Sequence, residues 1–122
     1  MRTACSERPD RKGQRVEVKF LRAAKGRLLE IWDDTERTWG ETQADEYVRG
    51  LVDAIHRAVD LRHQWRPLMD ATLSGVYYIR YQRHFIFFRE LSPKTIGVIS
   101  VLHETMNIPM RLRQDAARKE GD

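Results

Sequence analysis

Residues 76–103 read VYYIRYQRHFIFFRELSPKTIGVISVLH, and this stretch decides the fold. It contains three runs rich in β-branched and aromatic residues: Val76–Tyr81, His84–Arg89 and Ile96–His103. Gln82 and Arg83 separate the first two runs, and the turn-like segment Leu91–Lys94 separates the last two. Because both connections are short, the pattern predicts three antiparallel strands in a meander.

The middle run is apolar on both sides. Phe85 and Phe87 fall on one face of a strand, whereas Ile86 and Phe88 fall on the other. A strand with two apolar faces is typical of a sheet that is covered on both sides. We therefore expect this strand to be central.

Two amphipathic helices precede the meander. Apolar residues recur every three or four positions between Leu21 and Trp39, and again from about Glu41 to His63. Gly40 interrupts the two patterns, so the helices are expected to fold back as a hairpin. Thr42 and Asp45 have the spacing of a capping pair for the second helix.

A further strand is expected before the hairpin. Val16, Val18 and Phe20 alternate with charged residues, which is the period of a strand with one buried face. The resulting fold class is α+β: an N-terminal strand, an antiparallel two-helix hairpin and a three-stranded antiparallel meander.

The predicted domain spans residues 15–112. Residues 1–14 are polar and aperiodic, which predicts a disordered lead. Pro67 is expected to end any helical continuation, and residues 70–75 are turn-like. Pro109 closes the domain, and residues 113–122 are interpreted as a charged C-terminal tail.

The chain has 122 residues and a mass of 14.4 kDa, which excludes a multidomain enzyme. Its net charge of +4 is unevenly distributed. Residues 1–25 carry eight basic and three acidic side chains, residues 26–60 carry four and nine, and residues 61–122 carry ten and six. Either the helices have an ordinary solvated acidic face, or the protein presents two surfaces to two partners.

Motifs for metals, cofactors and membranes are absent from the sequence. Cys5 is the single cysteine, and the four histidines lie outside metal-ligand spacing. There is no glycine-rich phosphate loop, no signal-peptide pattern and no apolar run long enough to cross a bilayer. We expect a cytoplasmic protein without a metal or a cofactor.

Cations and histidines gather in the sheet half. Metal-free RNA cleavage needs a base, an acid and cations that neutralise the phosphate. The residue types that qualify are found at Arg80, Arg83, His84, Arg89 and His103. The alternative is that the arginines line solvated sheet edges and that the histidines make local hydrogen bonds. The residues alone leave both interpretations open.

Three tryptophans are large apolar groups for a chain of this size. Trp32 and Trp39 belong to the first helix, and Trp65 follows the second. We expect all three in the core, and an exposed one would mark an interface.

Three stretches resemble the RelE/ParE toxin superfamily of bacterial type II toxin–antitoxin systems. Trp39-Gly40-Glu41-Thr42-Gln43-Ala44, followed by Tyr47, is similar to the hairpin corner of the family. Arg83–Arg89 is similar to its His-x-Ile-x-Tyr/Phe-Arg strand. Val101–Asn107 is similar to the Leu-His-x-x-Met-Asp end of the ParE branch, with Asn107 in place of the usual aspartate.

The resemblance implies a ParE-like toxin that inhibits DNA gyrase by binding and is not a nuclease. It also implies a cognate antitoxin, ParD-like and of the ribbon-helix-helix type, through which the toxin contacts DNA only indirectly. Target-binding candidates are Arg83, His84, Arg89, His103, Met106 and Asn107. Antitoxin-binding candidates are Trp32, Trp39 and Tyr47.

Two alternatives remain at this point. The RelE branch cleaves ribosome-bound mRNA, and the cations and histidines of the sheet half qualify for that reaction. The third possibility is a non-toxic remnant that binds an antitoxin and has lost its activity.

Overall fold

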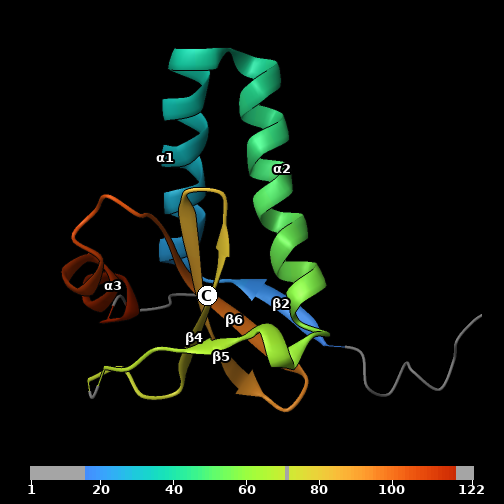
Figure 1. Cartoon of the computed structure of the whole chain (residues 1–122), viewed down its shortest axis with the longest axis vertical. Coiled ribbons are helices and arrows are strands. Elements are labelled where there is room, and N and C mark those ends of the chain that lie inside the picture. Colours follow the sequence, from blue (N-terminus) through green and yellow to red (C-terminus); the bar gives the residue numbers. More distant parts are fainter. Residues whose placement is uncertain (1–15, 71, 118–122) are drawn as a thin grey trace, which may run out of the picture.

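A five-stranded mixed sheet forms the base of the computed structural model, which describes residues 16–70 and 72–117 (Figure 1). The strands are β2 (Glu17–Phe20), β3 (Arg66–Pro67), β4 (Val76–Tyr81), β5 (His84–Ser92) and β6 (Thr95–His103). Their spatial order is β2-β6-β5-β4-β3. The helices are α1 (Arg22–Trp39), α2 (Glu41–Ala58), the short 3-10 helix η2 (Arg62–Gln64) and α3 (Ile108–Ala117).

The predicted meander is confirmed. Strands β4, β5 and β6 pair antiparallel in sequence order, and β2 lies parallel to β6 at one edge. Strand β5 is therefore internal, with a neighbour on each side. The α+β fold class predicted from the sequence is also confirmed.

The sheet is covered on both faces, as the alternation in the middle strand predicts. The hairpin-side core lies under α1 and α2 and includes Ile86 and Phe88. The α3-side core includes Phe87, Leu102 and Leu112, with Phe85 packed against it. A register shift between Phe87 and Phe88 marks a β-bulge in the β5–β6 ladder.

The helices α1 and α2 form the expected hairpin and run side by side in Figure 1. Gly40 joins them with a φ of 96°, a conformation that side-chain-bearing residues rarely adopt. The predicted capping role of Thr42 and Asp45 is wrong, because α2 begins at Glu41 and Gly40 occupies the cap position. Asp45 instead accepts a hydrogen bond of 2.8 Å from the Trp32 indole and ties α2 to α1.

Helix α2 ends at Ala58, five residues before the predicted end at His63. Trp65 explains the early end, because its ring is buried in the hairpin-side core. Its indole Nε1–H donates to the Ala58 carbonyl oxygen at 2.8 Å, and the same oxygen also accepts from the backbone N–H of Leu61 at 2.8 Å. The chain must therefore turn back beneath α2 to place this ring.

Glycine 50 allows α2 to approach β4 closely. A Cβ atom at this position would lie 2.1 Å from the hydroxyl oxygen of Tyr81. The Tyr81 ring also contacts the ring of Tyr47 on the same helix, with centroids 5.5 Å apart. The helix hairpin and the sheet are thus joined through aromatic side chains as well as aliphatic ones.

The segment after α2 contains an edge strand that the sequence did not reveal. Arg66 and Pro67 pair with Tyr78 and Tyr77 of β4. Proline is tolerated here because an edge strand needs no second set of backbone donors. The predicted lead, residues 1–14, lies outside the described residues.

The prediction that residues 113–122 form a tail outside the domain is wrong for residues 113–117. Helix α3 spans Ile108–Ala117 and packs on β6. Pro109 does not end the structure, because proline fits the first turn of a helix, where the backbone N–H has no intrahelical partner. Leu112 and Asp115 are both buried.

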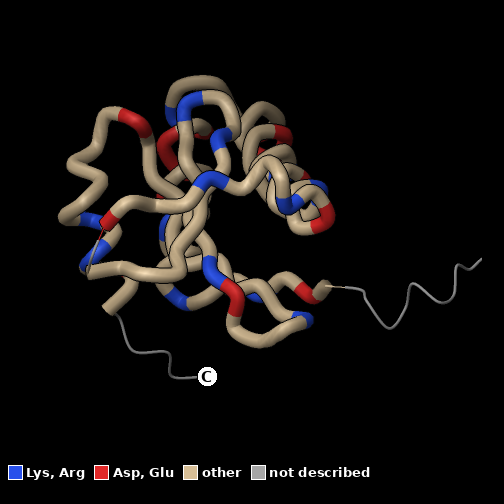
Figure 2. The backbone as a smooth tube through the Cα atoms, turned by 60° about the horizontal axis from the view of Figure 1, so that its bottom comes forward, with Lys and Arg blue, Asp and Glu red and all other residues tan. Residues whose placement is uncertain are grey.

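The charge blocks of the sequence do not form two faces of single sign. Figure 2 shows acidic and basic segments interleaved on the helices and beside the sheet. Several opposite charges form ion pairs, such as Arg113 with Asp70 and Arg62 with Glu90.

The described residues contain no helix with the length and apolar character that a membrane span requires.

Candidate functional site

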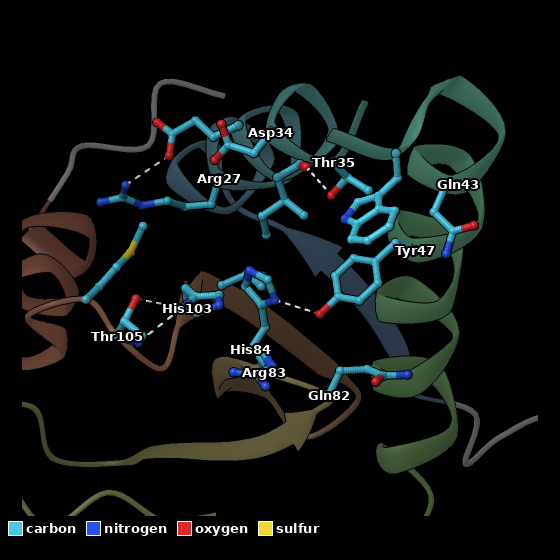
Figure 3. Close-up of a pocket in the computed structure, with 15 residues that line it drawn as sticks. Arg27, Asp34, Thr35, Gln43, Tyr47, Gln82, Arg83, His84, His103 and Thr105 are labelled. Carbon is cyan, nitrogen blue, oxygen red and sulfur yellow. Dashed lines mark hydrogen bonds and ion pairs between the residues drawn. The ribbon is translucent and has the colours of Figure 1, made fainter. Parts of the chain in front are cut away.

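A cavity of about 590 Å³ lies between the helix hairpin and the end of the sheet where β4 turns into β5 and β6 ends (Figure 3). Its walls come from α1, α2, the β4–β5 turn and the segment after β6. The lining residues are Arg27, Glu30, Ile31, Asp34, Thr35, Trp39, Gln43, Tyr47, Gln82, Arg83, His84, Val101, His103, Thr105 and Met106.

The hydrogen bond between Tyr47 and His84 joins α2 to β5 in this cavity. The Tyr47 hydroxyl oxygen lies 2.7 Å from Nδ1 of His84. Burial raises the pKa of Tyr47, although a hydrogen bond from the Arg83 main chain opposes this. The direction of this bond follows the His84 tautomer: Nδ1 accepts from the Tyr47 hydroxyl when the ring proton is on Nε2, and donates to it when the proton is on Nδ1.

The His84 imidazole is neutral at physiological pH. Burial and, to a lesser extent, the neighbouring His103 lower its pKa to about 4, while Glu104 opposes the shift. The hydrogen bond with the Tyr47 hydroxyl occupies Nδ1 of this ring. His84 therefore has almost no protonated form to serve as a general acid near pH 7.

The His103 ring stands against His84 at the same end of the cavity. Their ring centroids are 5.0 Å apart in an edge-to-face arrangement. Nδ1 of His103 accepts a hydrogen bond from the backbone N–H of Thr105 at 3.1 Å and lies 2.8 Å from its hydroxyl oxygen. A backbone N–H can only donate, so the proton of His103 resides on Nε2.

The two arginines of the β4–β5 hairpin share one carboxylate. Arg80 Nη2 lies 2.5 Å from Oε1 of Glu104, and Arg83 Nη1 lies 3.2 Å from Oε2. The Arg80 guanidinium also stacks over the Phe85 ring at 5.2 Å. Both cations thus have an acidic partner at this end of the sheet, which reduces what they offer to a phosphate.

A buried ion pair lies beside the cavity, whose lining includes Arg27 but not Asp115. Arg27 donates to Asp115 on α3 through Nε at 2.8 Å and through Nη2 at 3.2 Å. Ser100 on β6 donates to the same carboxylate at 2.6 Å. The hydrogen bonds that Arg27 donates to Asp115 are the main cause of the rise in the pKa of Arg27. This cluster joins α1, α3 and β6.

Four of the five residues selected for RNA chemistry lie at one end of the sheet. His84 and His103 are directly paired across β5 and β6, and both line the cavity with Arg83. Arg80 lies beside them through Glu104. The local hydrogen bond expected of His103 is observed, whereas the partner of His84 is 37 residues away.

Arg89 does not belong to this group. It lies five residues along β5 from His84, a distance of about 16 Å in a strand, and pairs with Gly97. By strand alternation its side chain falls on the opposite face of the sheet. Arg89 therefore lies apart from this cavity and does not line it.

The remaining site residues predicted from the sequence lie at several different places in the structure. Met106 and Tyr47 line the cavity, and Trp39 stands at its rim with 72% of its surface exposed. The expectation that Trp39 lies in the core is wrong, and Trp32 is only half-buried. Asn107 caps α3, because its main-chain oxygen and side-chain Oδ1 accept from Arg111 at 3.0 Å and Met110 at 3.4 Å.

Sequence reasoning missed Arg27, Asp34, Gln82 and the partner acids Glu104 and Asp115. Glu104 sits inside a motif that the sequence did single out, so its position carried a signal. Arg27 and Asp115 are 88 residues apart, and no local pattern connects them.

In the described ranges, no group of three or more His, Cys, Asp or Glu residues could hold a metal ion.

The chain belongs to the family of ParE toxins of type II toxin–antitoxin systems. The family model matches residues 18–108, which contain nearly the whole sheet, the helix hairpin and every lining residue of the cavity. The resemblance noted in the sequence is thereby confirmed, including the ParE branch.

The relatives agree with this assignment. Toxin ParE1 of Mycobacterium tuberculosis is 37% identical over 90 residues, which cover 74% of this chain and 91% of that protein. Toxin ParE1 of Caulobacter vibrioides is 31% identical over 90 residues, covering 73% and 90%.

Solved structures share the fold at low sequence identity. A chain of the chromosomal ParDE system of P. aeruginosa superposes with a TM-score of 0.62 at 18% identity, covering 74% of this chain and 97% of that one. A chain of the toxin–antitoxin complex RelBE2 of Mycobacterium tuberculosis gives 0.55 at 17% identity, covering 73% and 91%.

Proposed function

We propose that this ParE-family toxin acts by binding DNA gyrase and is neutralised by a cognate ParD-like antitoxin. The proposal rests on one observation, which is the protonation, hydrogen bonding and ion pairing of the histidines and arginines at the cavity. His84 is neutral, His103 accepts from Thr105, and the nearby arginines share Glu104. Such a site suits contact with a protein surface better than proton transfer or phosphate neutralisation.

The antitoxin part of the proposal has its own support. The matched structure from Mycobacterium tuberculosis is described as a toxin–antitoxin complex, and the one from P. aeruginosa as a ParDE system. The exposed Trp39 ring at the cavity rim is the kind of apolar surface that a partner covers.

Gyrase supercoiling and DNA-cleavage assays with the purified chain test the target. We expect inhibition of supercoiling, loss of that inhibition in Arg83→Glu, and an unchanged effect in Arg57→Glu. Arg57 is the matched control because it is an exposed arginine on α2 that does not line the cavity. Unchanged gyrase activity at a large molar excess of toxin would exclude this target.

A ribosome-dependent mRNA endonuclease is the second candidate. It is favoured by the convergence of His84 and His103 with Arg83 at one end of the sheet. Primer extension on transcripts after induction would then detect cuts at discrete codon positions, and uncut transcripts in arrested cells would rule it out. Absence of growth arrest without antitoxin would instead favour a non-toxic, antitoxin-binding remnant.

A further inference from the structure

The Arg89 side chain is half-buried and lacks a partner among residues 16–70 and 72–117. Its Nε atom is buried without a hydrogen-bond acceptor, and its guanidinium forms no ion pair there. A buried N–H group without an acceptor is destabilising, so such groups are rare in folded proteins. An anion that draws the guanidinium outward would give this donor an acceptor.

Arg89 belongs to a row of register neighbours that crosses the sheet from β4 to β2. The row consists of Val76, Arg89, Gly97 and Lys19. Val76 is part of the α3-side core, so the whole row lies on that face of the sheet. Neighbouring strands are about 4.8 Å apart, which places the Cα atoms of Arg89 and Lys19 roughly 10 Å from each other. Two cations therefore stand on either side of a glycine.

The surface between the two cations is apolar. Gly97 has no side chain, and Leu91 lies over it, because a Cβ atom at Gly97 would be 2.7 Å from Cδ1 of Leu91. The Leu91 side chain is 46% exposed. Helix α3 contacts β6 at Ser100, three residues further along the strand, a distance of about 10 Å. This end of the face is thus open to a partner.

The charge of the row is not neutralised from within the described chain. Lys19 is exposed and, like Arg89, forms no ion pair with a described residue. Glu17 is an acidic residue on the same face, two positions before Lys19 on β2, and it pairs with neither cation. The two cations are therefore available to an acid from outside.

The combination of charge and apolar contact favours an acidic protein segment as the occupant. A carboxylate matches the forked donors of a guanidinium and the point charge of an ammonium group. An aliphatic residue beside the acid would cover Leu91, whereas the phosphate backbone of a nucleic acid has no apolar group to place there.

We propose that Arg89 and Lys19 form a binding site for a carboxylate of a partner protein, with an apolar residue of the same segment packed on Leu91. The site lies on the opposite face of the sheet from the cavity that Arg83 lines. It is therefore separate from the contacts proposed for that cavity and does not depend on which target the toxin has.

An amide NMR titration of the full chain with two capped peptides tests the site. Ser-Gly-Glu-Leu-Glu-Gly-Ser carries the acids and the leucine, whereas Ser-Gly-Gln-Leu-Gln-Gly-Ser has the same shape without charge. We expect the acidic peptide to bind roughly tenfold more tightly, and less tightly as salt is added. It should shift the backbone amides of Leu91 and Gly97, and not that of Thr105 at the cavity.

Three variants locate the charges that matter. Arg89→Met should weaken binding of the acidic peptide roughly tenfold, and Lys19→Met roughly threefold. Arg57→Met is the matched control, because it removes an exposed arginine of α2 and should bind like the wild type. Lys19 is exposed, so Lys19→Met keeps the site testable even if Arg89→Met fails to fold.

Thermal unfolding separates binding from a structural role of Arg89. Arg89→Met removes the unpaired donor and keeps an unbranched stem, so its thermal midpoint should equal or exceed that of the wild type. A lowered midpoint with unchanged peptide affinity would show that Arg89 is structural and would overturn the proposal.

Other outcomes of the titration would also overturn it. These are equal binding of the two peptides, binding of neither, and shifts confined to the cavity. If a short oligonucleotide shifts the amides of Leu91 and Gly97 and the acidic peptide does not, the face binds nucleic acid. If the same amides shift when the chain alone is diluted, the face contacts a second copy of the chain.

Discussion

The chemistry of His84 is set by its three-dimensional surroundings. Three side chains act on the ring: Tyr47 of α2, His103 of β6 and Glu104, which follows β6. The sequence identified His84 and His103 as candidates because histidine is scarce and chemically versatile. It did not indicate that His84 would be held neutral, since that depends on burial and on residues far along the chain.

The lowered pKa of His84 predicts a pH dependence of stability. In the folded state this pKa is about 4, below its ordinary value of 6.5, so the unfolded chain binds the proton more readily. The contribution of His84 is complete above about pH 6.5 and is lost as pH falls towards 4. We expect a loss of about 1–2 kcal/mol, after allowance for partial exposure of the ring.

Urea denaturation across this pH range measures the effect. The slope of unfolding free energy against pH should be smaller in His84→Gln than in the wild-type chain, whereas the exposed His56→Gln should leave it unchanged. If the wild type and His84→Gln have the same slope, then the neutral state of His84 does not contribute to stability.

At the scale of elements, the sequence did not predict helix α3, and part of this helix was interpreted as a charged tail. Ile108, Leu112 and Ala116 have helical spacing, but the core-facing position beside them is Asp115. An acid at a buried position breaks the apolar stripe and makes the segment look like a charged tail. Its partner Arg27 lies 88 residues upstream, and only the fold brings the two together.

The ion pair between Arg27 and Asp115 predicts a large effect of Asp115→Asn. The variant leaves the guanidinium of Arg27, whose side chain is 12% exposed, without its main countercharge. We expect a loss of about 3–5 kcal/mol in the free energy of unfolding, with faster amide exchange in α3. The exposed Asp34→Asn should change stability by less than about 0.5 kcal/mol. Similar effects of the two variants in urea denaturation would contradict a buried ion pair.

At the scale of the whole molecule, Trp65 stabilises the fold, whereas Trp39 is proposed to bind a partner. Trp65 packs in the hairpin-side core against Phe88 and Tyr77, whereas Trp39 projects from the tip of the hairpin. The same residue type thus has two different roles, although the size and apolar character of the two rings predicted that both lie in the core.

This separation predicts opposite phenotypes for two tryptophan variants. Trp65→Ala should destabilise the protein by about 3–5 kcal/mol, because it removes a buried ring and leaves a void. Trp39→Ala should leave the thermal midpoint nearly unchanged yet weaken neutralisation by the antitoxin in a growth assay. Thermal unfolding monitored by circular dichroism distinguishes the two, and a large fall in the midpoint for Trp39→Ala would contradict its assignment to the surface.

The sequence by itself determined the order of first strand, helix hairpin and meander, the two-faced coverage of β5 and the family. These features are encoded locally, because strand and helix periods and short connections act over a few residues. Only the tertiary structure decided which tryptophan is exposed, where α3 docks and which side chains line the cavity. Those outcomes depend on contacts such as Tyr47 with His84 and Arg27 with Asp115, which are 37 and 88 residues apart. Burial and pairing at such separations arise from packing and leave no local periodic pattern.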